Sequence, residues 1–330
     1  MTHRPSLDPV VAAVRLAVRR GLASVPDGSR IVVGLSGGAD SLALTAATVF
    51  ESARRGIRVV AITVDHGLQE GSEDAAEAAR DAAEALGAAA RVVRVEVRGA
   101  GGPEAAARDA RYRALRDAAR VEGAAAILTG HTLDDQAETV LLGLARGSGA
   151  ASLQGMAAAS DLDGMPLLRP LLTVPRETTR AACAAEGLTP WDDPHNADAR
   201  FARVRVRERV LPVLEAELGP GVAEALARTA EQLREDAAAF EEMIDETIED
   251  IVEHAEAGIA VSVAALAANP PALRHRIIRH VVAAEFGESL TRVQTLEVAR
   301  LVTDWAGQGP IDLPACRAAR VGGRVVFTAR

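Results

Sequence analysis

Short apolar runs alternate with helix-spaced stretches along the first two thirds of the chain. The runs are rich in β-branched residues and lie at 31–35, 59–64, 92–97 and 125–128. The stretches between them, notably 72–86 and 104–121, repeat apolar residues at the spacing of an α-helix, and Asp8 with Pro9 marks the start of an earlier helix. Strands that alternate with helices of this length predict a doubly wound α/β fold, in which helices cover both faces of a parallel sheet.

The last third of the chain has a different pattern, in which helices follow one another without intervening strands. Helical spacing runs over 222–255, 273–286 and 290–305, and a short β-like tail follows at 321–328. The glycines and the proline of 218–221 mark the joint between the two patterns. We therefore predict two domains, 1–215 with the parallel sheet and 220–330 with a mostly helical organisation.

The charged residues exclude several kinds of chemistry. The 330 residues carry a net charge of −9 and include no lysine, so all 37 basic residues are arginine. A Walker A loop and a lysine nucleophile are both excluded by this composition. Only 2% of the residues are aromatic, so any bound RNA would be held mainly by arginine rather than by stacking.

The cysteines and the apolar segments favour a cytoplasmic protein. Cys183 and Cys316 are far apart and have no partner at CxxC spacing, which argues against a zinc site or a redox dithiol. Residues 1–9 lack the apolar core of a signal peptide, and no apolar run is long enough to span a membrane. We expect a cytoplasmic protein without a membrane partner.

A glycine turn with hydroxyl and carboxylate side chains follows the first apolar run. It consists of Ser36, Gly37, Gly38, Ala39, Asp40 and Ser41. The glycines allow close approach of the backbone, so N–H groups, a helix N-terminus and two hydroxyls can gather around phosphate oxygens. Asp40 can hold the Mg²⁺ that accompanies ATP. The alternative is a tight turn with Asp40 as a helix cap, but the position directly after the first strand favours a phosphate site.

Polar residues that follow the other strands are expected on the same rim of the sheet. Ligands of open α/β sheets bind beyond the carboxyl ends of the strands, where the strand order reverses. Asp65 and His66 follow the second run, and His131 opens the segment after the fourth run. These side chains are therefore predicted to converge with residues 36–41.

Two acids in the segment after the fourth run share one face of a predicted helix. Asp135 and Glu138 are three residues apart in its first turn. Such a pair suits metal coordination or recognition of an ammonium group. The alternative is that Thr132 or Asp134 caps the helix while the acids only complement the helix dipole, and both descriptions can hold together.

These segments resemble those of a known superfamily. Residues 36–41 resemble the SGGxDS loop of the PP-loop ATP pyrophosphatases, and 130–139 resemble the GHHxDDQAET segment of lysidine synthetases and related tRNA thiolases. Further segments are similar to lysidine synthetases in the same order, at 64–68, 110–113, 146–149, 155–156 and 168–172. The resemblance covers roughly residues 30–215 and implies an adenine nucleotide alpha hydrolase-like fold for the first domain.

A dense arginine segment extends the resemblance. Residues 192–209 are similar to the DxSN…RNxxR stretch of lysidine synthetases, and Arg203, Arg205 and Arg207 would lie along a strand or wrap around a helix. Such a run alone is most often a solvated face, whereas beside an ATP site contact with tRNA or reacting phosphate is the better interpretation. The departures from the family patterns are Thr132 for histidine, His195 for serine and Val204 for asparagine.

The resemblance to the lysidine synthetase family implies an ATP-dependent ligase. In that reaction the wobble cytidine of tRNA(Ile) with a CAU anticodon is adenylated through O2, and the ε-amine of free L-lysine then displaces AMP from C2. Decoding changes from AUG to AUA. The second domain would contact tRNA, with 274–280 either as a surface for the tRNA backbone or as an amphipathic helix with exposed arginines.

The resemblance also implies a role for each candidate site residue. ATP would be bound by residues 36–41 together with Asp65, His66 and His131. Mg²⁺ would be held by Asp40 and Asp135, and lysine would be recognised by Asp135 and Glu138. The negative charge that develops in the reaction would be stabilised by Arg111, Arg203 and Arg207. Arg111 on its own would be read as a surface residue of an amphipathic helix.

Two other functions remain open. A tRNA thiolase on the same fold would normally need cysteines or a bound cluster to handle sulfur, and Cys183 and Cys316 do not form the expected pairs. A non-catalytic nucleotide-binding regulator with a helical interaction domain would bind ATP without forming AMP. A homodimer is an option that the sequence leaves undecided.

Overall fold

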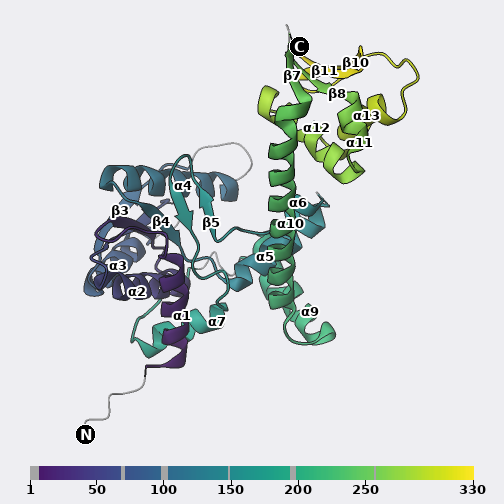
Figure 1. Ribbon diagram of the computed structural model, residues 1–330. Coiled ribbons are helices and arrows are strands. Elements are labelled where there is room, and N and C mark those ends of the chain that lie inside the picture. Colours follow the sequence, from purple (N-terminus) through teal and green to yellow (C-terminus); the bar gives the residue numbers. More distant parts are fainter. Residues whose placement is uncertain (1–6, 68–70, 98–102, 148, 194–197, 256–257) are drawn as a thin grey trace. The chain divides into compact units, whose positions relative to one another are not determined.

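The computed structural model describes residues 7–67, 71–97, 103–147, 149–193, 198–255 and 258–330. The chain divides into two compact units, Met1–Leu233 and Arg234–Arg330 (Figure 1). The boundary lies inside α10 (Val222–Ile251), beyond the joint that was predicted at 218–221. This joint is held in the first unit, because Glu215 accepts the backbone N–H groups of Gly221 and Ala223. The domain limits of 1–215 and 220–330 stay a prediction.

The first unit contains a six-stranded sheet in the order β3-β2-β1-β4-β6-β5. Its strands are β1 (Arg30–Gly34), β2 (Arg58–Asp65), β3 (Ala89–Arg94), β4 (Ala126–Thr129), β5 (Ala159–Asp161) and β6 (Pro166–Leu168). All neighbours pair in parallel except β5 and β6. The first, second and fourth predicted strands are therefore confirmed. The third begins three residues earlier than its apolar run, because Ala89 pairs with Val60 of β2.

Helices cover both faces of this sheet, as the doubly wound fold requires. The covering helices are α1 (Pro9–Gly21), α2 (Ala39–Ala53), α3 (Ser72–Ala85) and α7 (Arg176–Ala185) on one face and α4 (Pro103–Glu122) on the other. The first unit also contains α5 (Leu133–Arg146), α6 (Ala150–Leu153), α8 (Ala202–Arg205), the π-helical segment η2 (Val206–Val210) and α9 (Leu211–Leu218). Ile31 and Val33 of β1 pack in the core that α1, α2, α3 and α7 share. Val32 packs in the core beneath α4. Such burial on both faces explains the uninterrupted apolar runs.

The strand order reverses between β1 and β4, and their carboxyl ends meet there. A Cβ atom on Gly130, just after β4, would lie 3.0 Å from the backbone oxygen of Asp40. Only glycine therefore lets the loop after β4 approach the first turn of α2 this closely. This contact places the loop 36–41 and the start of α5 on one rim, where open α/β sheets bind ligands.

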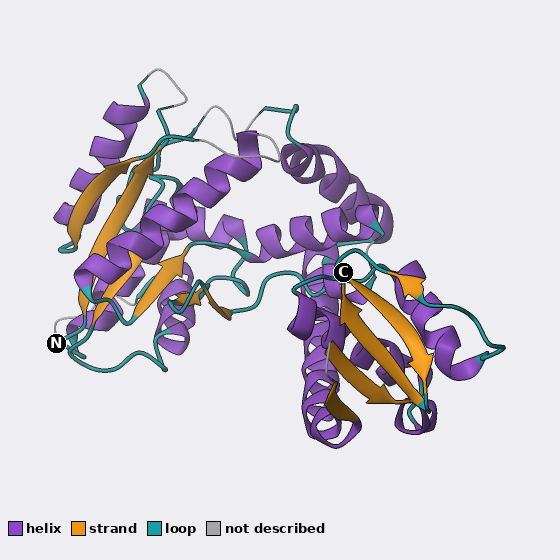
Figure 2. Ribbon diagram, turned by 90° about the horizontal axis from the view of Figure 1, so that it is seen from above, coloured by secondary structure: helices purple, strands orange, loops and turns teal. Residues whose placement is uncertain are grey.

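The second unit contains a five-stranded antiparallel sheet and helices around a separate apolar core (Figure 2). Its elements after α10 are β7 (Val252–Ala255), β8 (Gly258–Ser262), α11 (Val263–Ala268), α12 (Pro271–Phe286), α13 (Arg292–Thr303), β9 (Ile311–Asp312), β10 (Cys316–Val321) and β11 (Arg324–Ala329). The prediction of helices without intervening strands is corrected here. Residues 252–255, which were placed in a helix, and 258–262, which were left unassigned, each form a strand, because β7 pairs with β8 and β8 pairs with β11.

Among the residues that the structure describes, no helix has the length and apolar character that crossing a membrane requires.

Candidate active site

The loop between β1 and α2 has the geometry of an anion-binding turn. Gly37 adopts a φ of +83°, which favours glycine. The Ser41 hydroxyl accepts the backbone N–H of Ser36 at 3.1 Å and donates to the carbonyl oxygen of Gly38 at 2.9 Å. No side chain caps α2 at Gly38, so N–H groups of its first turn remain open to an anion. The alternative of Asp40 as the cap is wrong, because Asp40 lies inside the first turn.

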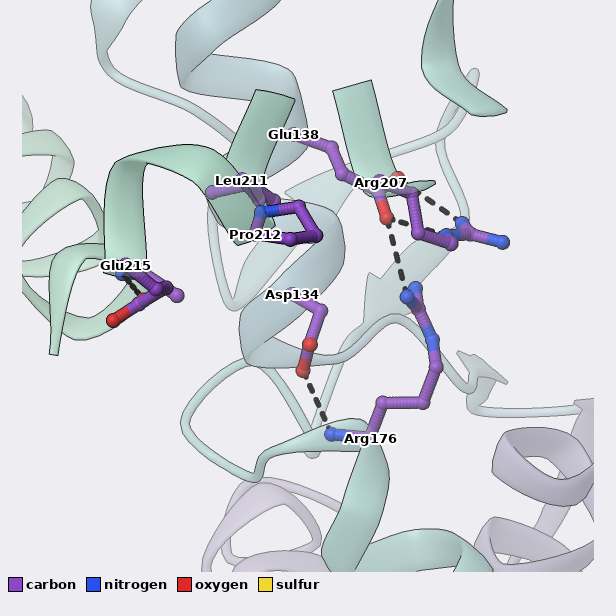
Figure 3. Close-up of a pocket in the computed structure, with 8 residues that line it drawn as sticks. Asp134, Glu138, Arg176, Arg207, Leu211, Pro212 and Glu215 are labelled. Carbon is purple, nitrogen blue, oxygen red and sulfur yellow. Dashed lines mark hydrogen bonds and ion pairs between the residues drawn. The ribbon is translucent and has the colours of Figure 1, made fainter. Parts of the chain in front are cut away.

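Six charged side chains gather beside this loop and are called the acid–arginine cluster. They are Asp40, Asp135, Glu138, Arg176, Arg203 and Arg207. Arg176, the first residue of α7, contacts all three carboxylates, each through a different nitrogen. Its Nε lies 3.5 Å from Oδ2 of Asp40, and its Nη2 lies 2.8 Å from Oδ1 of Asp135. Its Nη1 lies 3.2 Å from Oε1 of Glu138 (Figure 3).

Glu138 is the most enclosed carboxylate of the cluster, with 0% of its side chain exposed. Arg207 binds it through two nitrogens, with Nε 2.7 Å from Oε1 and Nη2 3.1 Å from Oε2. Arg203 Nε lies 3.8 Å from Oε2, and its Nη2 donates to the Thr139 hydroxyl at 3.2 Å. Arg203 and Arg207 are four residues apart on a helical segment, so the helical alternative is confirmed. Arg205 faces away and donates to backbone carbonyls.

Asp135 has both roles that the sequence left open. Its Oδ2 accepts the backbone N–H of Thr132 at 2.8 Å, and Thr132 accepts the Asp135 N–H, which completes a capping box. Its Oδ1 faces Arg176. Burial alone would raise the pKa of Asp135, but the charges of Arg176 and Arg203 and the hydrogen bond from Thr132 lower it. Asp135 is therefore an ionised group that joins the helix cap to the cluster.

Asp40 connects the cluster to the phosphate loop. Its Oδ1 accepts the hydroxyl of Thr179, and its Oδ2 faces Arg176, so one face of α7 holds both oxygens. Burial raises the pKa of Asp40, and the Thr179 hydrogen bond and the Arg176 charge oppose this shift. A carboxylate in this place fits a Mg²⁺ ion that is shared with ATP phosphates. Asp135 fits such an ion less well, because Thr132 and Arg176 occupy its oxygens.

A second group of arginines surrounds a tyrosine on the same rim and is called the arginine–tyrosine cluster. It consists of Arg108, Arg111, Tyr112 and Arg169. The guanidinium carbons of Arg108 and Arg111 lie 5.0 Å and 5.6 Å from the centre of the Tyr112 ring. Arg169 is buried, and its Nε has no hydrogen-bond partner. Within the described part of the chain, no carboxylate forms an ion pair with these three arginines.

The two histidines beside the arginine–tyrosine cluster are held neutral. Burial, reinforced by the charges of Arg111, Arg108 and Arg169, lowers the pKa of His131 to about 3 even though Asp135 opposes the shift. Its Nδ1 lies 3.0 Å from the Thr129 hydroxyl. Burial and Arg111 also lower the pKa of His66. Both histidines are therefore uncharged near neutral pH, chiefly because they are buried and secondarily because of the nearby arginines.

The comparisons with known proteins agree on one family. The model of the PP-loop domain matches residues 14–214, and the model of the TilS substrate binding domain matches residues 262–326. The tRNA(Ile)-lysidine synthase of Leifsonia xyli is 60% identical over 91% of this chain and 90% of that protein. The enzyme of the same name from Salinispora tropica is 52% identical over 97% of both chains.

The chain belongs to the tRNA(Ile)-lysidine synthase family.

A solved structure extends the likeness in fold. The U34-tRNA thiolase of Methanococcus maripaludis, at 22% identity, covers 68% of this chain and 79% of its own with a TM-score of 0.58. At this identity the likeness concerns the fold alone.

Two of the three departures from the lysidine synthase patterns lie in described residues. Thr132 caps α5, which gives this side chain a structural use. Val204 is a buried residue of α8, next to Arg203. His195 lies outside the described residues, as do Leu68, Ser148, Pro194 and Asn196 of the similar segments.

Asp65 and His66, two of the predicted ATP-binding residues, lie at the end of β2, and the structure shows a local role for Asp65 there. Asp65 is buried, and its Oδ1 accepts the backbone N–H of Gly67 at 2.9 Å. Burial would raise the pKa of Asp65, but this bond, a hydroxyl bond from Ser72 and the charge of Arg94 lower it. Asp65 therefore fixes the turn after β2. Its contact with ATP, and that of His66, stays a prediction.

Sequence reasoning missed Arg176 and Thr179, which organise the acid–arginine cluster from α7. One signal was present: a cation in the first turn of a helix opposes the helix dipole, so Arg176 must be held there by something outside its own helix. Thr179 follows three residues later on the same face. The partners on α2 and α5 are 136 and 41 residues away in sequence, so they could not be identified from local spacing.

The arginines of α12 differ from the interpretation as an amphipathic helix with exposed arginines, whereas the interpretation as a surface for the tRNA backbone stays a prediction. Arg274 is buried, and Arg276 stacks on the Phe240 ring at 4.2 Å from its centre. Burial and the charges of Arg276 and Arg292 lower the pKa of Arg279. These side chains are partly packed into the second unit and are not the freely exposed face that the helical pattern suggested.

Proposed function

We propose that this protein ligates lysine to C2 of the wobble cytidine of tRNA(Ile) with a CAU anticodon. ATP is cleaved between its α- and β-phosphates, the cytidine is adenylated through O2, and the ε-amine of lysine then displaces AMP to give lysidine. The modified anticodon reads AUA in place of AUG. The observation that carries this proposal is the acid–arginine cluster beside the anion-binding loop, in a chain of this family.

The phosphate loop supplies the first half of this reaction. The open N–H groups at the start of α2 and the hydroxyls of Ser36 and Ser41 can hold the oxygens of the departing pyrophosphate. Asp40 lies in the same turn and would hold Mg²⁺, which would supply neutralising charge when it is bound with ATP. Hydrogen bonds within the loop, from the Ser36 N–H to the Ser41 hydroxyl and from that hydroxyl to the Gly38 carbonyl oxygen, fix these groups in place, which is what electrostatic stabilisation requires.

The arginine–tyrosine cluster supplies the anion site for the second substrate. Its three arginines have no carboxylate partner among the described residues, and Arg169 has an unpartnered buried Nε. An anion beside them would relieve the mutual repulsion that Arg108 and Arg203 exert on Arg111. We assign to this cluster the α-phosphate at the reacting cytidine or a neighbouring tRNA phosphate.

The acids of the acid–arginine cluster supply recognition of lysine. A cavity of about 210 Å³ adjoins them and is lined by Asp134, Glu138, Arg176, Arg207, Leu211, Pro212, Glu215 and Ala223 (Figure 3). Carboxylates, guanidinium groups and an apolar wall together match a molecule that carries ammonium groups, a carboxylate and an alkyl chain. The carboxylates of Asp135 and Glu138 would receive an ammonium group of lysine.

The second unit is proposed to contact the tRNA, in keeping with the substrate-binding model that it matches. We place the reaction in the cytoplasm. The option of a homodimer stays a prediction.

The test is to incubate the purified protein with tRNA(Ile)(CAU), ATP and labelled lysine. We expect label in the tRNA together with AMP and pyrophosphate in equal amounts. A tRNA whose wobble cytidine is replaced by uridine serves as the control and is expected to stay unlabelled. ATP binding without AMP formation would support a nucleotide-binding regulator, and sulfur entering the tRNA from a sulfide donor would support a thiolase; either result with unlabelled tRNA would overturn the proposal.

A further inference from the structure

Arg176 occupies the place where a cationic substrate would be recognised. Its three guanidinium nitrogens face three different carboxylates, and its backbone N–H donates to Asp134 at 2.7 Å. Arg176 Nη1 and Arg207 Nε share the same oxygen of Glu138. The substrate ammonium that the proposed function assigns to Asp135 and Glu138 therefore meets a cation that is already bound.

The oxygens of Asp135 and Glu138 are already occupied in the acid–arginine cluster. Each of them faces an N–H or O–H donor, which Thr132, Arg176 and Arg207 provide. None of the Glu138 side chain is exposed, so its attraction to a cation is weakly screened by water. An ammonium group can therefore reach these oxygens only when one of the arginines leaves.

Of the three arginines that hold these acids, only Arg176 also contacts the phosphate loop. Its Nε lies 3.5 Å from Oδ2 of Asp40, and Asp40 lies in the loop that would hold the ATP phosphates. Arg207 binds Glu138 through two nitrogens, whereas Arg176 makes a single nitrogen–oxygen contact with each carboxylate. A phosphate bound in the loop would offer Arg176 a new anionic partner beside Asp40.

We propose that Arg176 is a placeholder cation that sets the order of substrate binding. Without nucleotide it neutralises Asp135 and Glu138 and keeps lysine out. When ATP fills the loop after β1, the guanidinium moves toward its phosphates, and the two acids become free for the lysine ammonium. Lysine is thereby admitted only when the group that activates the cytidine is present. This inference rests on the proposed function and makes Arg176 a positioning residue.

A placeholder of this kind couples the two ligands thermodynamically. If ATP tightens the binding of lysine by a given factor, lysine tightens the binding of ATP by the same factor. A merely structural Arg176 would affect folding stability and both affinities without changing this factor. The coupling, rather than activity, is therefore the diagnostic quantity.

The experiment measures the dissociation constant of lysine by calorimetry, with and without α,β-methylene ATP and Mg²⁺, and that of the nucleotide with and without lysine. For the wild type we expect the nucleotide to tighten lysine binding about tenfold or more, a coupling of about 1.4 kcal/mol. For Arg176→Gln we expect lysine to bind without nucleotide, with a coupling factor below about two. Arg180→Gln, which changes an exposed arginine of the same helix, is the matched control and should behave as the wild type.

The other possible results test the role of Arg176, the binding order and the lysine site separately. An unchanged coupling factor in Arg176→Gln overturns the role of Arg176 and leaves the lysine site intact. Lysine binding by the wild type that is independent of nucleotide overturns the binding order. No lysine binding by the wild type with nucleotide and tRNA present overturns the proposed lysine site itself. If Arg176→Gln does not fold, Arg176→Lys is used instead, because it keeps the positive charge but lacks the several N–H donors of the guanidinium group. Its coupling factor should be smaller than that of the wild type. A coupling factor as large as that of the wild type overturns the proposal.

Discussion

The two arginine clusters on the rim of the sheet differ in whether carboxylates accompany them. In the acid–arginine cluster every guanidinium faces Asp40, Asp135 or Glu138. In the arginine–tyrosine cluster the described residues provide an aromatic ring, carbonyl oxygens and a serine hydroxyl, but no carboxylate. Among the described residues, the acid–arginine cluster therefore contains paired charges of both signs, whereas the arginine–tyrosine cluster has an excess of positive charge. Substrates of opposite charge are thus assigned to neighbouring places.

The largest expected effect comes from breaking the link between the phosphate loop and the acid–arginine cluster. Asp40→Ala removes the carboxylate that joins them and should lower the rate of pyrophosphate release at least about a hundredfold, the scale of a lost charge-stabilising group. Ser36→Ala should act in the same direction. Asp81→Ala, at an exposed acid that pairs with Arg80, is the control. Near-normal release by both loop variants would show that the anion lies elsewhere.

A change of Glu138, the most buried acid of the acid–arginine cluster, is expected to lower both the stability of the protein and its recognition of lysine. Glu138→Gln leaves Arg207 and Arg176 without their shared carboxylate, and breaking a buried pair costs roughly 3–5 kcal/mol. Loss of a charge-assisted hydrogen bond should also weaken lysine use about tenfold or more. Urea unfolding and kinetics with lysine and ATP varied separately measure the two effects. Normal lysine kinetics in a destabilised variant would make Glu138 a structural residue only.

A change in the arginine–tyrosine cluster is expected to lower activity strongly while the stability of the protein changes little. Arg111→Gln should lower lysidine formation strongly while the free energy of unfolding changes by about 1 kcal/mol or less, because no carboxylate is left unpaired. If Arg111 binds a tRNA phosphate, the slope of log affinity against log salt should fall by about 0.7–0.9. The exposed Arg113 on the same helix, changed to Gln, is the control. A large drop in melting temperature would contradict the assignment.

The smallest effect concerns the pH dependence that follows from the burial of His131 beside the arginine–tyrosine cluster. Its pKa of about 3 lies below the ordinary value of 6.5, so between these values the unfolded chain binds a proton that the folded chain does not. Stability is then fully present above about pH 6.5 and falls as the pH is lowered toward 3. Between pH 7 and 5 the loss should be roughly 1–2 kcal/mol. His131→Gln should show a flatter stability profile, and an equally steep one would assign the acid sensitivity to other groups.

Local patterns in the sequence were enough to predict much of the fold and part of the site. Uninterrupted β-branched runs such as 31–35 predicted central parallel strands, because both faces of such strands are buried. The glycines and hydroxyls of 36–41 predicted an anion-binding turn, since the required conformation depends on those residues and their neighbours. The pattern failed in the second unit, where 252–255 looks like a continuation of α10. Residues 252–255 form a strand because they pair with β8, which in turn pairs with β11 near the end of the sequence.

What the sequence by itself determined, then, is the set of charged residues and the local elements that carry them. Asp40 begins a helix, Asp135 and Glu138 share a helical face, and Arg203 and Arg207 are four residues apart. Only the tertiary structure decided that α7 brings Arg176 and Thr179 between them. The physical reason is that charge pairing depends on distance in space. Arg176 gains its partners from two helices, α2 and α5, and Gly130 allows the loop between β4 and α5 to approach the first turn of α2.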